Sequence, residues 1–251
     1  QRSLVGSEMC IRDRMEEWWS QILNNCQQMS LDHQRVCSCK DKIVSLMDRQ
    51  GRLALPRTIF NDDKNILEAF VSNGLLVINR TSVAFTHQSF LDYFLAQKVI
   101  EKLYEGANLV DLYRPVKQQL PALRYRFLMV LQTLLDSDPD VFVEQAKNIL
   151  ECDDIHYYFK CAVFEIIGQW DGEIEPGIFS LVKQYQEVSK WKQFIFRTVY
   201  LGHLNFIQHY FDGCEQTWLD KDGMQLLQSI SDSAPDFVFA CVQPYAFQSQ
   251  E

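Results

Sequence analysis

The chain lacks the glycine-rich patterns that bind phosphates or present a nucleophilic serine. None of its 10 glycines lies in a Gly-x-x-x-x-Gly-Lys-Ser/Thr, Gly-x-Gly-x-x-Gly or Gly-x-Ser-x-Gly pattern. These patterns supply the backbone amides of nucleotide-binding loops and the sharp turn that carries a hydrolase serine. We therefore predict that this chain holds no catalytic residues and is not an enzyme by itself.

Positive charge and long apolar runs are also scarce. Lysine and arginine number 24 against 33 aspartates and glutamates, which gives a net charge of −9. An excess of acid opposes attraction to a phosphate backbone, so a nucleic-acid partner is not expected. No run of about 18 uncharged apolar residues occurs, so we predict neither a membrane-spanning helix nor a membrane partner.

The eight cysteines show no disulfide or metal-binding framework. No signal peptide is recognisable, and the core is too large to need disulfides. Cys26, His33, Cys37 and Cys39 are close in sequence, but Cys37 and Cys39 would project about 200° apart on a helix, and no Cys-x-x-Cys accompanies them. We predict free thiols in a reducing cytoplasm and no metal site.

The apolar content, at 47% of residues, is ample for a buried core, but the first residues do not contribute to it. Residues 1–14 show no helical or strand periodicity and are similar to translated sequencing-adapter tails of metagenomic reading frames. We expect a non-native tail there, with the encoded protein starting mid-gene near Met15 and its upstream domains missing. Residues 15–36 form a helical lead-in, with apolar residues spaced three and four apart at Trp18, Trp19, Ile22, Leu23 and Cys26.

Residues 37–106 carry the pattern of a winged helix. A helix ended by Gly51 precedes a short extended piece, and a second helix, capped by Asp62 and Asp63, should bury Ile66, Leu67, Phe70 and Val71. Two short strands follow, at residues 75–78 and 83–86 around a turn. Ser89 is the expected N-cap of the next helix, whose apolar stripe continues to Gly106.

Residues 107–251 read as successive helices separated by short breaks. Breaks are predicted at Pro121, 137–139, 153–154, 171–172, Gly202, 212–213 and 234–235. We predict a mainly α fold: a winged-helix module with one small β-hairpin, followed by an irregular α-solenoid or helical bundle. Asp153 and Asp154 are expected to cap a helix rather than to catalyse.

The junction between the second predicted strand and the helix after it has a moderately specific sequence pattern. The two strands at 75–78 and 83–86 are the wing of the predicted winged helix. The pattern reads Phe-x-His-x-Ser-Phe-x-x-Tyr-Phe-x-Ala, from Phe85, His87, Ser89, Phe90, Tyr93, Phe94 and Ala96. This pattern resembles the end of the winged helix in STAND-type P-loop NTPases of the NACHT class, and the resemblance covers residues 40–103. It implies that the chain is the regulatory and sensor fragment of an ATP-dependent signalling or antiviral defence switch, whose catalytic module lies upstream.

The resemblance also assigns a cofactor and partners. The fragment alone would hold no cofactor, whereas the parent would bind ADP or ATP with Mg, and His87 would reach the ADP diphosphate from the winged helix. The partners would be the upstream nucleotide-binding domain, a protein trigger on the helical tail and further copies of the protein on activation. On physical grounds, a histidine just before a helix N-terminus suits an anion, but a partly buried histidine bonded to backbone fits the pattern as well.

Two other functions remain open. In a DNA-binding winged-helix regulator, the helix at residues 62–73 would enter a major groove, but Lys64 is its only basic residue, against Asp62, Asp63 and Glu68. In a plain helical-repeat scaffold there would be no nucleotide switch at all.

Overall fold

The computed structural model describes residues 5–170, 172–202, 204–211, 221–232 and 234–246. It confirms a mainly α fold with a small antiparallel sheet. The chain divides into two compact units, residues 1–133 and 134–251, and the boundary expected after residue 106 falls inside the first unit. The first unit extends further because α5 (Leu109–Tyr113) packs on α4 (Gln88–Tyr104).

Two long helices open the first unit. Helix α1 spans Val5–Gln28, so it begins well before Met15 even though residues 5–14 carry no apolar stripe from which a helix could be predicted. Helix α2 spans His33–Gln50, and the Asp32 carboxylate caps it by accepting from the Arg35 amide at 2.8 Å. Gly51 ends α2 as predicted, because its φ of 60° is left-handed and readily adopted by glycine.

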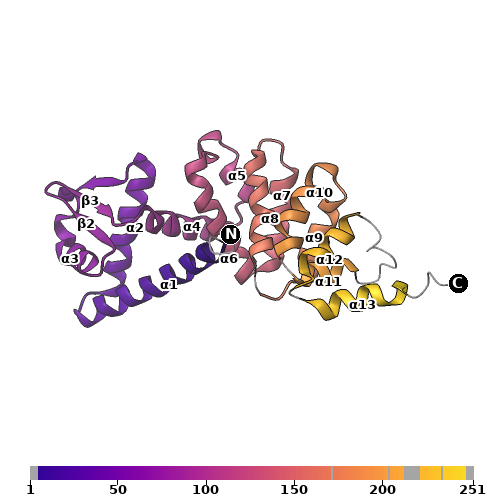
Figure 1. The fold of residues 1–251 in the computed structure, drawn as a ribbon. Helices are drawn as coiled ribbons and strands as arrows, with labels where there is room; N and C mark the ends of the chain where they lie inside the picture. The colour runs from indigo at the N-terminus through magenta and orange to yellow at the C-terminus, as the bar shows by residue number, and fades with distance from the viewer. Residues whose placement is uncertain (1–4, 171, 203, 212–220, 233, 247–251) are drawn as a thin grey trace. The chain divides into compact units, whose positions relative to one another are not determined.

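A winged-helix arrangement follows α2. Strand β1 (Ala54–Pro56) leads into the 3-10 helix η1 (Arg57–Asp63) and α3 (Lys64–Ser72), and β2 (Leu76–Ile78) and β3 (Ser82–Phe85) form the wing beside α3 (Figure 1). The sheet order is β1-β3-β2 with antiparallel pairing. The predicted hairpin is therefore confirmed and gains a third strand, since Leu55 pairs with Val83 and both side chains are fully buried.

Two predictions about helix ends and faces are wrong. In α3, Ile66, Leu67 and Phe70 are buried as expected, but Val71 is 38% exposed, and the fourth buried position is Ala69. The N-cap of α4 is His87 rather than Ser89, because the chain turns into the helix directly after Thr86. Ser89 lies inside the first turn.

Short elements connect α4 to the second unit. After Gly106, whose φ is 98°, the chain forms α5, η2 (Val116–Gln118), η3 (Pro121–Leu123) and α6 (Arg124–Ser137). The predicted break at Pro121 is confirmed as η3.

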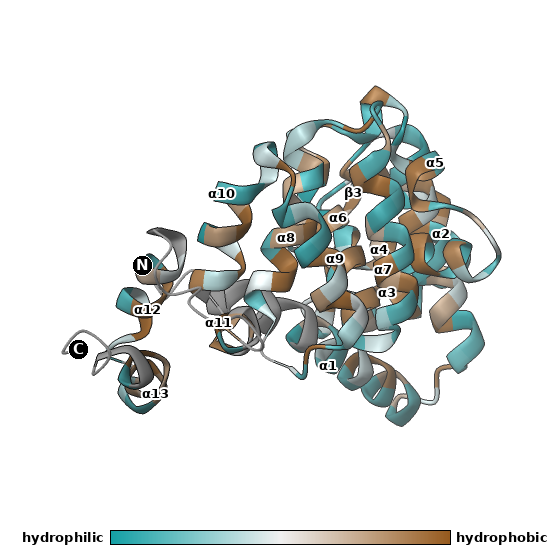
Figure 2. Cartoon of the chain, turned by 90° about the vertical axis from the view of Figure 1, so that its right-hand side faces the viewer, coloured by the Kyte–Doolittle hydropathy of each residue, from teal (hydrophilic) through white to brown (hydrophobic). Residues whose placement is uncertain are grey.

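The second unit consists of short helices in contact with their neighbours. They are α7 (Pro139–Glu151), α8 (Tyr157–Gln169), α9 (Pro176–Gln186), α10 (Ser189–Thr198), η4 (Tyr200–Gly202), α11 (Leu204–Phe211), α12 (Lys221–Ile230) and α13 (Pro235–Ala246). Helix α7 contacts α8 and α9, and α10 contacts the same two helices. Each helix carries both hydrophobic and hydrophilic residues, as Figure 2 shows for α10.

Most of the predicted breaks in the second unit are confirmed. A loop separates the helices at 153–154, α7 begins at the Pro139 break, and α13 begins at Pro235 of the 234–235 break. The break between α9 and α10, at residues 187–188, was not predicted because no glycine or proline marks it. The break expected at 212–213, and Asp171 in the break before α9, lie outside the described residues.

Candidate functional site at the wing-to-helix junction

His87 is exposed at the junction between β3 and α4. Its backbone is extended, with φ −132° and ψ 138°, and its carbonyl accepts from the Phe90 amide at 3.2 Å. Its imidazole has no hydrogen-bond partner among the residues that the structure describes. The alternative of a partly buried histidine bonded to backbone is therefore wrong for this chain, and both ring nitrogens are open to a ligand.

The exposure of alternate residues rises steadily toward His87. Val83 is fully buried, Phe85 is half-buried and His87 is exposed. Alternate residues of a strand share a face. Strand β3 ends at Phe85, however, and the chain beyond it leaves the core. His87 thus lies beyond the strand and is exposed to solvent.

Thr86 fixes the backbone next to His87. Its amide donates to the Leu75 carbonyl at 3.0 Å, and its hydroxyl donates to the Gly74 carbonyl at 2.7 Å. Gly74 needs its left-handed φ of 74°, and a Cβ there would lie 3.3 Å from the Trp18 ring. Sequence reasoning missed Thr86, although a hydroxyl beside a strand end is a common signal for such a bond.

The rest of the junction motif is aromatic core. Phe90 meets Trp18 of α1 edge to face at 4.6 Å between ring centroids, and Phe94 meets Trp19 at 5.2 Å. The Lys40 ammonium lies 5.1 Å from the Phe94 ring centroid. These contacts between α1, α2 and α4 hold the start of α4 in place, and His87 with it.

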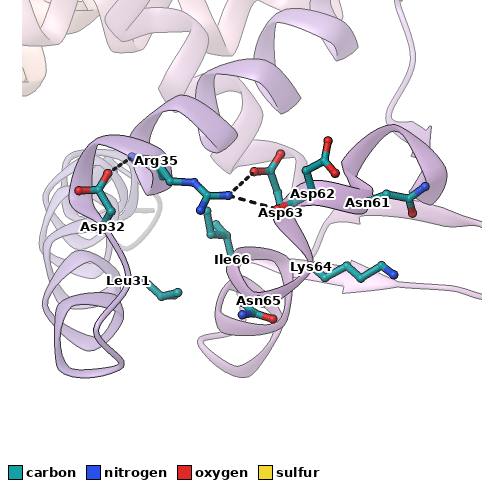
Figure 3. A pocket seen from close by; sticks show the side chains of 9 residues that line it. All are labelled: Leu31, Asp32, Arg35, Asn61, Asp62, Asp63, Lys64, Asn65 and Ile66. Atoms are coloured by element: carbon teal, nitrogen blue, oxygen red, sulfur yellow. Dashed lines mark hydrogen bonds and ion pairs between the residues drawn. The ribbon is translucent and has the colours of Figure 1, made fainter.

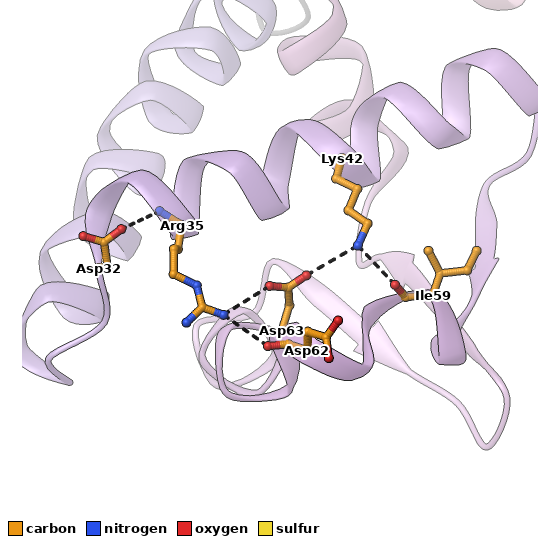
Figure 4. Close-up of polar contacts among 6 residues, drawn as sticks. All are labelled: Asp32, Arg35, Lys42, Ile59, Asp62 and Asp63. Carbon is orange, nitrogen blue, oxygen red and sulfur yellow. Dashed lines mark hydrogen bonds and ion pairs between the residues drawn. The ribbon is translucent and has the colours of Figure 1, made fainter.

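A charged cluster fixes η1 and α3 on α2. The Asp63 carboxylate lies 3.7 Å from the Arg35 guanidinium and 3.6 Å from the Lys42 ammonium (Figure 4). Arg35 also donates to the Asp62 carbonyl at 3.2 Å, and Lys42 to the Ile59 carbonyl at 3.1 Å. The predicted capping role is wrong, because Asp63 is the N-cap of α3 but makes no side-chain cap bond. The two cations of α2 draw its carboxylate away.

A pocket of about 260 Å³ lies beside this cluster, where α2 and α3 begin. Figure 3 shows the side chains of its lining, which include the carboxylates of Asp32, Asp62 and Asp63 and only two cations, Arg35 and Lys64. Arg35 already binds Asp63. This face of the winged helix is therefore unsuited to a phosphate backbone.

A buried ion pair joins α4 to α6. Asp92 has a side chain only 5% exposed, and its carboxylate lies 3.3 Å from the Arg126 guanidinium, which is also 3.5 Å from Asp48 at the end of α2. Burial raises the pKa of the Asp92 carboxyl, and the nearby Arg126 charge partly offsets that rise. Arg126 also has a buried Nε without a hydrogen-bond partner. Sequence reasoning did not identify this pair.

The other candidate groups do not form a site. Within the described ranges, no three histidine, cysteine or acidic side chains are placed to hold a metal ion. Cys37 Sγ lies 3.9 Å from His33 Nδ1, whereas Cys39 is buried, and its burial raises the pKa of its thiol to about 12. The N-cap of α8 is His156 and not Asp153 or Asp154 as expected.

Comparisons with known proteins give no relative for this chain. No family model, no curated protein and no solved structure matches it. None of the helices in the described part of the chain combines the length and hydrophobicity that a bilayer span requires.

Proposed function

We propose that this chain is the winged-helix and sensor part of a STAND/NACHT-type, ATP-dependent switch in signalling or antiviral defence. The observation that supports the proposal most is the exposed imidazole of His87, in a motif whose other aromatic residues are buried or half-buried. A core-forming motif needs no histidine at this position, and the ring takes no part in packing. An imidazole that is held by its backbone and left open suits a ligand supplied from outside the chain.

In this mechanism the ligand is the diphosphate of ADP in an upstream nucleotide-binding domain of the same protein, which also holds Mg and hydrolyses ATP. A ring N–H of His87 donates to a phosphate oxygen and stabilises the closed state. The neighbouring amides at the start of α4 add a favourable field for the anion. His87 acts here as a binding residue, and the fragment alone does not turn over ATP.

The helical tail then binds a protein trigger in the cytoplasm. Binding favours the open state only by as much as the trigger prefers that state, and the open state assembles with further copies of the protein. The DNA-binding alternative is weaker. Lys64 is the only cation on α3, and the pocket where α3 begins is rich in carboxylates.

Two measurements test the proposal. The first is the DNA sequence upstream of the Met15 codon, in which we expect a Gly-x-x-x-x-Gly-Lys-Ser/Thr motif within a few hundred codons. The second is an ATPase assay of the 251-residue chain, in which we expect no turnover above buffer. An upstream sequence without that motif, ATP turnover by the chain alone, or a salt-sensitive shift of duplex DNA would each contradict the proposal.

A further inference from the structure

A second pocket of the first unit has a different electrostatic character from the one in Figure 3. It has a volume of about 430 Å³ and lies between the end of α2, the first turns of α4 and the segment from η2 to the start of α6. Four cationic side chains line it, Arg49, Arg52, Lys117 and Arg126, against two carboxylates. His87 is not among its lining residues.

Three of the four cations of this pocket have no acidic partner in the described part of the chain. Both carboxylates, Asp48 and Asp92, pair with Arg126. Arg49, Arg52 and Lys117 form no ion pair with any residue that the structure describes. Arg49 lies in the last turn of α2, where the helix dipole stabilises a cation. Arg52 and Lys117 lie outside the α-helices, so no helix dipole stabilises their charge. In a chain with a net charge of −9, this is a local excess of positive charge.

The pocket also has an apolar wall. Leu53, which is 57% exposed, lines it together with the buried Met47, Leu91 and Leu95. Unpaired cations beside an apolar wall match a ligand with a multiply charged head and an apolar body. A phosphate fits the head better than a single carboxylate, because it carries more charge and because guanidinium groups bind its oxygens in pairs.

We propose that this pocket binds a small phosphate ester, with the phosphate held by Arg49, Arg52 and Lys117 and the organic group against Leu53 and the buried apolar residues beside it. The ligand would tie the end of α2 to the segment between α5 and α6. This site is independent of the role proposed for His87, because it needs no residue from outside the chain.

Calorimetric titration of the whole chain tests the site at fixed ionic strength. The probes are inorganic phosphate, pyrophosphate and phenyl phosphate. We expect pyrophosphate to bind more tightly than phosphate because of its charge, and phenyl phosphate to bind more tightly than phosphate because of its ring. The double variant Arg52→Ser/Lys117→Ser should weaken pyrophosphate binding by about tenfold or more, since it removes two charged donors.

Two control variants distinguish binding in this pocket from a general charge effect and from binding at the wing junction. Arg57→Ser/Arg80→Ser changes the net charge equally with cations outside the pocket and should leave the affinity unchanged. His87→Ala should also leave it unchanged. Circular dichroism checks that each variant is folded.

Three outcomes would overturn all or part of the proposal. Equal affinity of both double variants for pyrophosphate, or no binding of any probe, would contradict the proposed site. A loss of pyrophosphate affinity in His87→Ala would show that the anion binds at the wing junction and not in this pocket. Equal affinity for phenyl phosphate and phosphate would show that the apolar wall does not bind the organic group.

Discussion

The two units of the molecule differ in the contacts that join their helices. In the first unit, charged side chains reach between elements, as in Arg35 with Asp63 and Arg126 with Asp92. Aromatic rings pack between helices in both units, and in the second unit they surround Trp191, which lies 5.3 Å from Phe164 between ring centroids. Ion pairs have a few discrete arrangements and respond to charge, whereas aromatic packing depends on shape. The ion pairs of the first unit should therefore respond to salt and to charge substitutions, and the packed rings of the second unit to changes in side-chain size.

Removing the central ring of the second unit should have the largest effect. Trp191 is fully buried, and Trp191→Ala should lower the free energy of unfolding by about 4 kcal/mol, because it removes a large apolar side chain and leaves a cavity. Chemical denaturation followed by circular dichroism measures the change. Phe239→Ala is the matched control, because Phe239 is 63% exposed, and its effect should stay within about 0.5 kcal/mol. Equal effects of the two variants would show that Trp191 is not central.

Breaking the buried pair of the first unit should have the next largest effect. Asp92→Ala leaves the Arg126 guanidinium with only the exposed Asp48, and we expect a loss of about 3 kcal/mol in the free energy of unfolding. Adding Arg126→Met should recover part of that loss, because it removes the uncompensated charge. Asp111→Ala breaks a pair whose two side chains are both more than half exposed and should have little effect. No recovery in the double variant would contradict the pairing.

The Asp63 cluster should contribute less, since its cations are partly exposed. Asp63→Ala should destabilise the chain by about 1 kcal/mol at low salt and by less at high salt, because Arg35 and Lys42 are 64% and 44% exposed. Asp62→Ala should change little, since Asp62 contributes only its backbone carbonyl to the cluster. A salt-independent loss in Asp63→Ala would point to packing instead of charge.

The smallest expected effect is a pH dependence from Asp92. The pKa of this carboxyl is raised in the folded state, so the folded protein binds the Asp92 proton more tightly than the unfolded chain does. The stability that comes from this proton uptake is complete below the unfolded pKa and is lost as pH rises through the folded pKa. Lowering the pH from 7 toward 4 should therefore favour the folded wild type relative to Asp92→Asn. Unfolding free energies of both proteins across that range measure the difference. Parallel curves would contradict a raised pKa.

Local sequence signals predicted most of the fold but little of the polar structure. Gly51 marked the end of α2 because few other residues adopt its left-handed backbone. The winged-helix order followed from short apolar runs between such signals. The pairing of Asp92 with Arg126 could not be predicted, since 34 residues separate them and no periodicity links them. The only sequence signal was an aspartate inside an apolar stripe.

The capping predictions failed for a related reason. Asp62 and Asp63 precede a helix, which favours capping. The Asp63 carboxylate instead pairs with Arg35 and Lys42 on another helix. Tertiary charges overrode a local preference. His87 was identified because its motif resembles a known family. Its exposure depends on where β3 ends, and the sequence pattern does not define that residue.

The release of ADP from the intact protein tests the role of His87 most directly. With the proposed upstream nucleotide-binding domain joined to this chain, the dissociation rate of a fluorescent ADP can be followed for wild type and His87→Ala. We expect the variant to release ADP about tenfold faster, the value of one hydrogen bond to a charged phosphate. Identical release rates, in a variant with unchanged thermal stability, would contradict an imidazole that restrains the ADP state.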